Sequence, residues 1–271
     1  MKYTIKLMFC IGLIGICFFL NLFIFWSVQF KQPIFLKHYY ELGLEEGTAF
    51  KIGCLMNKDD PRQLVEIAFP EFQEIGDFFR VCPGEQFNLN AHHEKREYWI
   101  EYVNKGDMLP IEEEMTLKRA KMTFSNGDEM DIDIGQIVFY PIQYENNVVD
   151  IEMSRASNSG EIALIGHFTE DAYLEEIKST LDPLVKDFIK IEVNGSRPEA
   201  QFFKQGMTWK LEGIMKIEPT DSRKLNYYEV QSRIYFKDTK GKMCVKRILN
   251  LRHEPDFNKI ESYKYLGKAG E

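Results

Sequence analysis

The stretch Met115–Tyr140, MTLKRAKMTFSNGDEMDIDIGQIVFY, carries the strongest local folding signal in this chain. Apolar residues recur at about every second position on both sides of a polar turn, Ser125–Asp128. An Asn-Gly pair between two runs of period two is the strongest short-range signal for a β-hairpin. We therefore predict an antiparallel hairpin here and a fold built mainly from strands.

Similar strand patterns recur through most of the chain. Short runs rich in β-branched and aromatic residues, bounded by turn residues, are predicted at 48–56, 64–69, 72–82, 96–103, 148–153, 162–168, 188–193, 207–217, 227–236 and 243–251. Strands and helices do not alternate as they would in a parallel sheet. The pattern predicts one or two antiparallel β-sandwich domains of immunoglobulin-like architecture, although the Cys, Trp, Cys spacing of true immunoglobulin domains is missing.

One amphipathic helix is expected between Thr169 and Pro183. Thr169 is a suitable N-cap, and two acidic residues follow it in the first turn. Leu174, Ile177 and Leu181 then recur at helical spacing, and the proline would end the helix.

An apolar stretch near the N-terminus, Leu7–Phe30, contains no charged residue. Its 24 residues would form a helix of about 36 Å, enough to cross a hydrocarbon core of roughly 30 Å. The core is longer than that of a cleavable signal peptide, and no small-residue cleavage pattern follows it. We predict an uncleaved anchor that places this segment in a lipid bilayer of the cell membrane.

The flanks of this segment indicate its orientation. Lys2 and Lys6 precede it, which favours residues 1–6 inside the cytoplasm and the rest of the chain outside. Trp26 lies near the outer end, where an interfacial aromatic residue is expected. Asn21 is either a hydrogen-bonding contact with another membrane helix or a tolerated polar residue.

The remaining chain is expected to divide into three parts. Residues 31–47 would form a stalk with a short helical segment ended by Gly43 and Gly47. A β-rich domain would span residues 48–142. Residues 143–271 would form a second β-rich domain or a continuation of the first.

Charge and cysteine content restrict the class of partner. The net charge of −8 lies entirely beyond the apolar stretch, which argues against nucleic acid or an anionic membrane surface as a ligand. Outside that stretch only Cys54, Cys82 and Cys244 remain, too few for a disulfide framework. A single bridge between Cys54 and Cys82 stays open as an alternative.

No catalytic, cofactor-binding or metal-binding residue is assigned from the sequence. His92-His93-Glu94 is interpreted as an exposed polar loop and not as a metal site, because strand neighbours point to opposite faces. Glu129, Asp131 and Asp133 do not fit the spacing of a calcium loop and are expected on the solvated face of a strand. The linear motifs of nucleophilic, zinc and phosphate sites are absent.

Aromatic residues gather in three places, and either core packing or a binding face for sugar or peptide could explain them. These groups are Tyr98-Trp99 with Tyr102, Phe202-Phe203 with Trp209, and Tyr227-Tyr228 with Tyr235. Core packing is the favoured explanation, since alternate residues of a strand face inward.

The favoured function is that of a single-pass membrane protein that binds or scaffolds a protein or envelope ligand outside the cytoplasm. One alternative is a membrane-tethered hydrolase of cell-envelope polymers or peptides, which would need clustered carboxylates or histidines in a concave site. Another is a regulator that faces the cytoplasm in the reverse orientation. The oligomeric state is not assigned.

Overall fold

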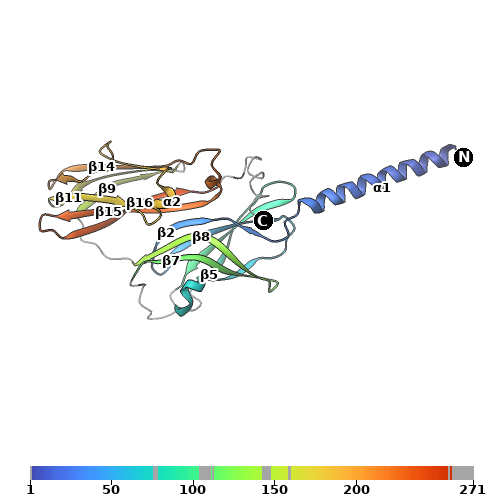
Figure 1. Ribbon diagram of the computed structural model, residues 1–271, viewed down its shortest axis with the longest axis horizontal. Helices are drawn as coiled ribbons and strands as arrows, with labels where there is room; N and C mark the ends of the chain where they lie inside the picture. Colours follow the sequence, from blue (N-terminus) through green and yellow to red (C-terminus); the bar gives the residue numbers. More distant parts are fainter. Residues whose placement is uncertain are drawn as a thin grey trace.

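The computed structural model describes residues 2–75, 79–103, 111, 113–141, 148–157, 160–255 and 257. One long helix, α1 (Lys2–Val28), projects from a body built of β-strands (Figure 1). The strands form one large sheet and two smaller sheets. These elements confirm the prediction of a mainly β chain with an N-terminal apolar helix.

The first half of the body contains eight strands. They are β1 (Ile34–Phe35), β2 (His38–Leu44), β3 (Ala49–Asn57), β4 (Leu64–Ala68), β5 (Phe79–Asn88), β6 (His93–Tyr102), β7 (Met115–Phe124) and β8 (Glu129–Pro141). A 3-10 segment, η1 (Pro70–Ile75), lies between β4 and β5.

The second half of the body also contains eight strands. They are β9 (Val149–Ala156), β10 (Glu161–Phe168), β11 (Ala172–Lys178), β12 (Ile189–Val193), β13 (Gln201–Phe203), β14 (Thr208–Met215), β15 (Tyr227–Asp238) and β16 (Met243–His253). Two short helical segments, α2 (Asp182–Val185) and η2 (Ser222–Leu225), connect them.

The large sheet runs through the whole body in the order β13-β11-β15-β2-β8-β7-β4, and β16 pairs with β15. The two smaller sheets have the orders β1-β3-β6-β5 and β12-β14-β10-β9. Among the described strands, β2 lies parallel to β8 and to β15, and the other pairs are antiparallel.

Two hydrophobic cores divide the body into two lobes. In lobe 1 the β1-β3-β6-β5 sheet packs on β2, β4, β7 and β8 around residues such as Ile52, Ile100 and Phe139. In lobe 2 the β12-β14-β10-β9 sheet packs on β11, β15 and β16 around residues such as Leu211 and Phe236. Sandwich packing of antiparallel sheets, as predicted, is therefore present in both lobes. The predicted boundary at residues 142–143 lies outside the described residues.

The predicted stalk at residues 31–47 is wrong, because β2 occupies the centre of the large sheet. Tyr40, Leu42 and Leu44 belong to the core of lobe 1, and Tyr39 packs against the core of lobe 2. A strand that borders two cores is buried on both sides, so it lacks the half-polar alternation by which strands are recognised. Gly43 and Gly47 made residues 31–47 resemble a connecting segment.

The amphipathic helix predicted between Thr169 and Pro183 is also wrong. Residues Ala172–Lys178 form strand β11, and only Asp182–Val185 are helical. The register of β11 against β15 shifts between Leu174 and Glu176, so one extra residue is inserted there. This bulge separates the core-facing Leu174 and Ile177 by three positions, which imitates helical spacing.

The predicted hairpin over Met115–Tyr140 is confirmed. Strands β7 and β8 pair through ten-residue and thirteen-residue segments, and Gly127 has the positive φ of 85° that the turn requires. The strand expected over 72–82 begins later, because Pro70–Ile75 is a 3-10 segment and β5 runs from Phe79 past Pro83. A proline is tolerated there because β5 is an edge strand with a register shift after Pro83.

Candidate functional site

The helix α1 presents an apolar surface that the described chain leaves largely uncovered. Phe23 and Trp26 are each 72% exposed, and none of the segment Ile11–Val28 is buried. By length and composition this segment is suited to cross a membrane. The Asn21 side chain donates to the Cys17 carbonyl at 2.8 Å, so its amide is hydrogen-bonded within its own helix.

The end of this helix is fastened to lobe 1 without a flexible linker. His93 Nε2 donates to the Val28 carbonyl at 2.7 Å. Two residues later, the Phe30 N–H donates to Asn57 Oδ1, and Asn57 Nδ2 donates back to the Phe30 carbonyl, both at 2.9 Å. The Phe30 ring stacks on His93 with centroids 4.2 Å apart, and Phe25 meets the ring of His92 at 5.5 Å.

The interpretation of His92-His93-Glu94 as an exposed loop is wrong. His93 and Glu94 are buried at the start of β6, beneath the end of α1. Burial lowers the pKa of His93, which favours the neutral ring, and the contact with the Val28 carbonyl oxygen assigns its proton to Nε2. Within the described part of the chain, no group of three or more His, Cys, Asp and Glu side chains could hold a metal ion.

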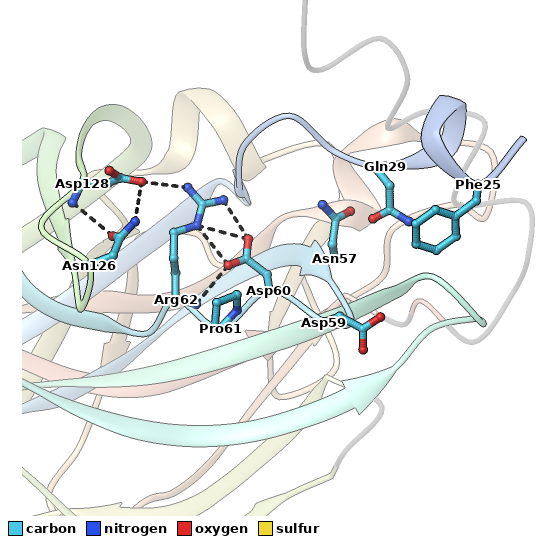
Figure 2. A pocket seen from close by; sticks show the side chains of 9 residues that line it. All are labelled: Phe25, Gln29, Asn57, Asp59, Asp60, Pro61, Arg62, Asn126 and Asp128. Carbon is cyan, nitrogen blue, oxygen red and sulfur yellow. Dashed lines mark hydrogen bonds and ion pairs between the residues drawn. The ribbon is translucent and has the colours of Figure 1, made fainter. Parts of the chain in front are cut away.

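A cleft lies between the end of α1 and two loops of lobe 1, with a volume of about 420 Å³ (Figure 2). One wall comes from α1, and the other comes from the β3–β4 loop and the β7–β8 turn. The lining residues are Phe25, Gln29, Asn57, Asp59, Asp60, Pro61, Arg62, Asn126 and Asp128. This cleft could not be predicted from local sequence patterns, because its two loops lie about 30 and 100 residues beyond the end of α1 in the chain.

Arg62 dominates the electrostatics of the cleft. It lies between Asp60 and Asp128, with Nη2 2.7 Å from Asp60 Oδ2 and Nη1 3.3 Å from Asp128 Oδ2 (Figure 2). Partial burial acts to raise the pKa of Asp60, but the hydrogen bonds from Arg62 outweigh it and hold that pKa below its usual range. The Asp60 carboxylate and the guanidinium therefore both stay charged.

A buried ion pair supports the floor of the cleft from below. Arg96 donates from Nη1 to the Arg62 carbonyl and from Nη2 to the Asp60 carbonyl, each at 2.6 Å. Its Nε also donates to the buried carboxylate of Glu94. The loop that carries Asp60 and Arg62 is thus held through its backbone as well as through its side chains.

A second buried network occupies the other face of the same strand. Glu97 Oε1 lies 2.8 Å from Lys95 Nζ and accepts from the Tyr227 hydroxyl at 2.8 Å, and Lys51 Nζ lies 3.4 Å from Glu97 Oε2. Burial acts to raise the pKa of Glu97, but the bonds from Lys95 and Tyr227 outweigh it and lower the pKa. The pairs Glu94 with Arg96 and Lys95 with Glu97 are spaced by two residues, a strand signal that the sequence offered.

The cleft does not match the chemistry that the hydrolase alternative requires. A glycosidase-type mechanism needs one carboxylic acid with a raised pKa opposite a second free carboxylate. Asp60 has a lowered pKa, and both Asp60 and Asp128 bind Arg62. The arrangement is a fixed ion-paired wall beside the end of α1 and not an acid–base pair.

The aromatic residues divide between the core and the surface. Tyr98, Tyr102, Phe203, Trp209, Tyr227 and Tyr228 are buried, as core packing predicts. In contrast, Trp99 is 40% exposed and Phe202 is 37% exposed, so these two remain candidates for a binding face.

Cys54 and Cys82 are both free, so the bridge considered between them is not formed in this structure. They lie on β3 and β5, which flank β6 on opposite sides, opposite Arg96 and Trp99 respectively. Two strand spacings separate their backbones by about 9.6 Å, beyond the roughly 7 Å that a disulfide spans.

The acidic residues Glu129, Asp131 and Asp133 are exposed on β8, as expected for the solvated face of a strand. Glu129 pairs with Lys121 at 2.8 Å, and Asp133 pairs with Lys37 at 2.6 Å. These carboxylates are therefore balanced by neighbouring lysines.

Comparison with known proteins identifies no family. No protein-family model and no curated protein matches the chain. Among solved structures, the titin domains Z1Z2 in complex with telethonin match with 10% identity over 80% of this chain and 95% of that chain, at a TM-score of 0.22. Fibronectin(III)-like modules of Clostridium thermocellum CbhA match with 10% identity over 83% of this chain and 95% of that chain, at a TM-score of 0.23.

The secreted serine protease VesC from Vibrio cholerae also matches, with 9% identity over 88% of this chain and 55% of that chain, at a TM-score of 0.21. Overlap at this level carries no argument about activity. Function must therefore be argued from the geometry of the chain itself.

Proposed function

We propose that this chain is a single-pass membrane protein that holds a two-lobed β-sandwich against the outer surface of the membrane and works by binding a partner there. The observation that supports this most is the junction between α1 and lobe 1. An exposed apolar helix passes within two residues into backbone hydrogen bonds with Asn57. A signal peptide that is cleaved off would not require these hydrogen bonds to the folded body.

The junction also favours one placement of the body. If Ile11–Val28 lies in the bilayer, the cleft with Phe25 and Arg62 lies at the level of the lipid headgroups. Strands β11 and β15 of lobe 2 then lie at the end of the body opposite α1 (Figure 1). In that placement, lobe 2 would be accessible to other molecules.

A test of membrane insertion is extraction of the expressed full-length chain from membranes with alkaline carbonate, followed by intact mass measurement. The proposal expects the protein to stay in the membrane pellet with α1 still attached. A soluble product that lacks the first residues would indicate a cleaved signal peptide and contradict the proposal.

Sidedness is tested with an introduced thiol, because the native Cys54 and Cys244 are buried. In a Cys82→Ser background, Lys240→Cys places an exposed thiol on the β15–β16 turn. A membrane-impermeant maleimide should label it in intact cells, whereas a Lys2→Cys control should react only after lysis. The opposite pattern would support the cytoplasmic-facing regulator.

A further inference from the structure

Four side chains form a row across the outer face of lobe 2, from β13 to β16. Phe202 lies opposite Tyr173, Tyr173 lies opposite Lys237, and Lys237 lies opposite Met243. Neighbouring strands are about 4.8 Å apart, so the row is about 14 Å long. We call these four residues, with Glu176, Tyr235 and Val245 in the next row, the distal face.

Three of the four residues in the row are apolar, where an outer sheet face is normally polar. Tyr173 is 46% exposed, Met243 48% and Phe202 37%. Their sequence neighbours Leu174, Phe203 and Cys244 point the other way, into the core of lobe 2. The exposed side chains therefore contribute nothing to that core. Phe202 and Tyr173 are adjacent, and Lys237 lies between Tyr173 and Met243 in the row. Exposed apolar side chains grouped in this way mark interaction surfaces.

Lysines border the distal face. Lys237 lies within the row, and Lys240 and Lys242 follow on the adjoining turn, all of them exposed. None of the three forms an ion pair with a residue that the structure describes, whereas Glu176 is paired with Lys178 at 2.7 Å. The nearby carboxylate of Asp238 is buried and accepts the backbone N–H groups of Lys240 and Lys242. A positive border is unexpected in a chain with a net charge of −8.

We infer that the distal face docks an acidic segment of another polypeptide, whose apolar side chains contact Phe202, Tyr173 and Met243 and whose carboxylates face the three lysines. Aromatic and methionine side chains are enriched in the buried centres of protein interfaces. Charge complementarity at the border then selects acidic partners over basic ones. This inference rests on the binding function proposed above and specifies its surface and its ligand class.

Other occupants fit the distal face less well. The rings of Tyr173 and Phe202 are tilted by 44° with centroids 4.7 Å apart, so they pack on each other and do not form a flat platform for a sugar. A second copy related by a two-fold axis would place lysines against lysines. A membrane surface is disfavoured because lobe 2 lies at the opposite end of the body from α1 (Figure 1).

The test uses the full chain in lipid nanodiscs and a phage-displayed library of random dodecapeptides. We expect enriched peptides to combine Asp or Glu with large apolar residues, and their binding to weaken as salt concentration rises. The double substitution Tyr173→Ser and Phe202→Ser should weaken the enriched peptide by at least about tenfold in fluorescence anisotropy. Lys237→Glu should weaken it as well.

The matched control is the double substitution Ile151→Ser and Met153→Ser on the edge strand β9, where the side chains are similarly exposed at 38% and 45%. It should leave peptide binding unchanged. The thermal midpoint of each variant should stay close to that of the parent, because the altered side chains lie outside the core.

Three outcomes would overturn the inference. They are the absence of any enriched peptide, enrichment of neutral or basic peptides, and binding that the Tyr173 and Phe202 substitutions do not alter. Dimerisation of the parent chain that these same substitutions abolish would show a second copy to be the occupant instead. Peptide binding in nanodiscs does not depend on sidedness, so failure of the thiol-labelling test leaves this result interpretable.

Discussion

His38 is a fully buried histidine that the fold keeps neutral. Its Nε2 accepts the Gly53 N–H at 3.0 Å, and its ring stacks on Tyr227 with centroids 4.8 Å apart. A Cβ at Gly53 would lie 2.6 Å from the Tyr227 hydroxyl, so the glycine is required for this packing. Desolvation lowers the pKa of His38 from 6.5 to about 3.

This burial predicts that the protein loses stability in acid. Between pH 6.5 and about pH 3, His38 is protonated in the unfolded chain but stays neutral in the folded chain. The free energy of unfolding should therefore fall as pH falls through this window, by at most about 1.4 kcal/mol per pH unit from this residue. Urea unfolding across the window should show a shallower pH dependence in His38→Gln, and an unchanged slope would contradict the assignment.

Removing the buried negative charge of Glu97 should lower the free energy of unfolding strongly. Glu97→Gln would leave Lys95 buried beside a neutral amide, which we expect to cost about 3 to 5 kcal/mol of unfolding free energy. Glu101→Gln is the matched control, because it lies on the same strand face and pairs with the exposed Arg80 at 2.5 Å. That change should cost about 1 kcal/mol or less. Equal losses in urea unfolding would show that the Glu97 network does not behave as a buried pair.

At the scale of elements, the junction between α1 and β3 predicts a loss of rigidity when Asn57 is altered. Asn57→Ala removes both hydrogen bonds to Phe30. A spin label at the exposed Lys31→Cys should then become more mobile in its continuous-wave EPR spectrum. Asn126→Ala, in the same cleft but bonded within its own turn to Asp128, should leave the spectrum unchanged. Equal mobility in both variants would contradict the fastening role of Asn57.

Elements defined by neighbouring residues were predictable, and those defined by distant partners were not. The hairpin of β7 and β8 was evident because its pairing and its turn lie in one continuous stretch. Strand β2 was missed because its partners, residues 135–141 and 227–229, lie far along the chain. Strand β11 was missed because its bulge altered the apolar period.

The candidate site was missed for the same physical reason. Its fastening bonds join Phe30 to Asn57 and Val28 to His93, across 27 and 65 residues. No local pattern encodes such contacts. Glu94 and Arg96, like Lys95 and Glu97, are opposite charges two residues apart, and this spacing was a visible sign that a strand with internal ion pairs begins there.

At the scale of the whole molecule, the continuous sheet predicts that both lobes unfold together. Glu41 on β2 accepts from Ser179 Oγ at 2.7 Å, from Thr180 N–H at 2.6 Å and from Gln231 N–H at 2.9 Å, all in the second half of the chain. These bonds tie the shared strand to lobe 2 in addition to its pairing with β15.

Glu41→Ala should separate the two transitions. In a Trp26→Phe background, Trp99 reports on lobe 1 and Trp209 on lobe 2, since these are the remaining tryptophans. The parent should show one urea midpoint by both probes, whereas Glu41→Ala should lower the lobe 2 midpoint first, with a loss of about 1 to 3 kcal/mol for the donors left unpaired. Two distinct midpoints already present in the parent would contradict cooperative unfolding.

The parallel placement of β2 has a mechanical consequence for an anchored protein. If α1 spans a membrane and a partner binds lobe 2, tension between them would enter through α1 and β1, pass into β2 and leave along β15. Because the two strands run in the same direction side by side, such a pull would slide one strand along the other. Their hydrogen bonds would then bear the force together and would not open one after another as in a zipper. The pairing of β2 with β15 therefore places the hydrogen bonds between these two strands under shear.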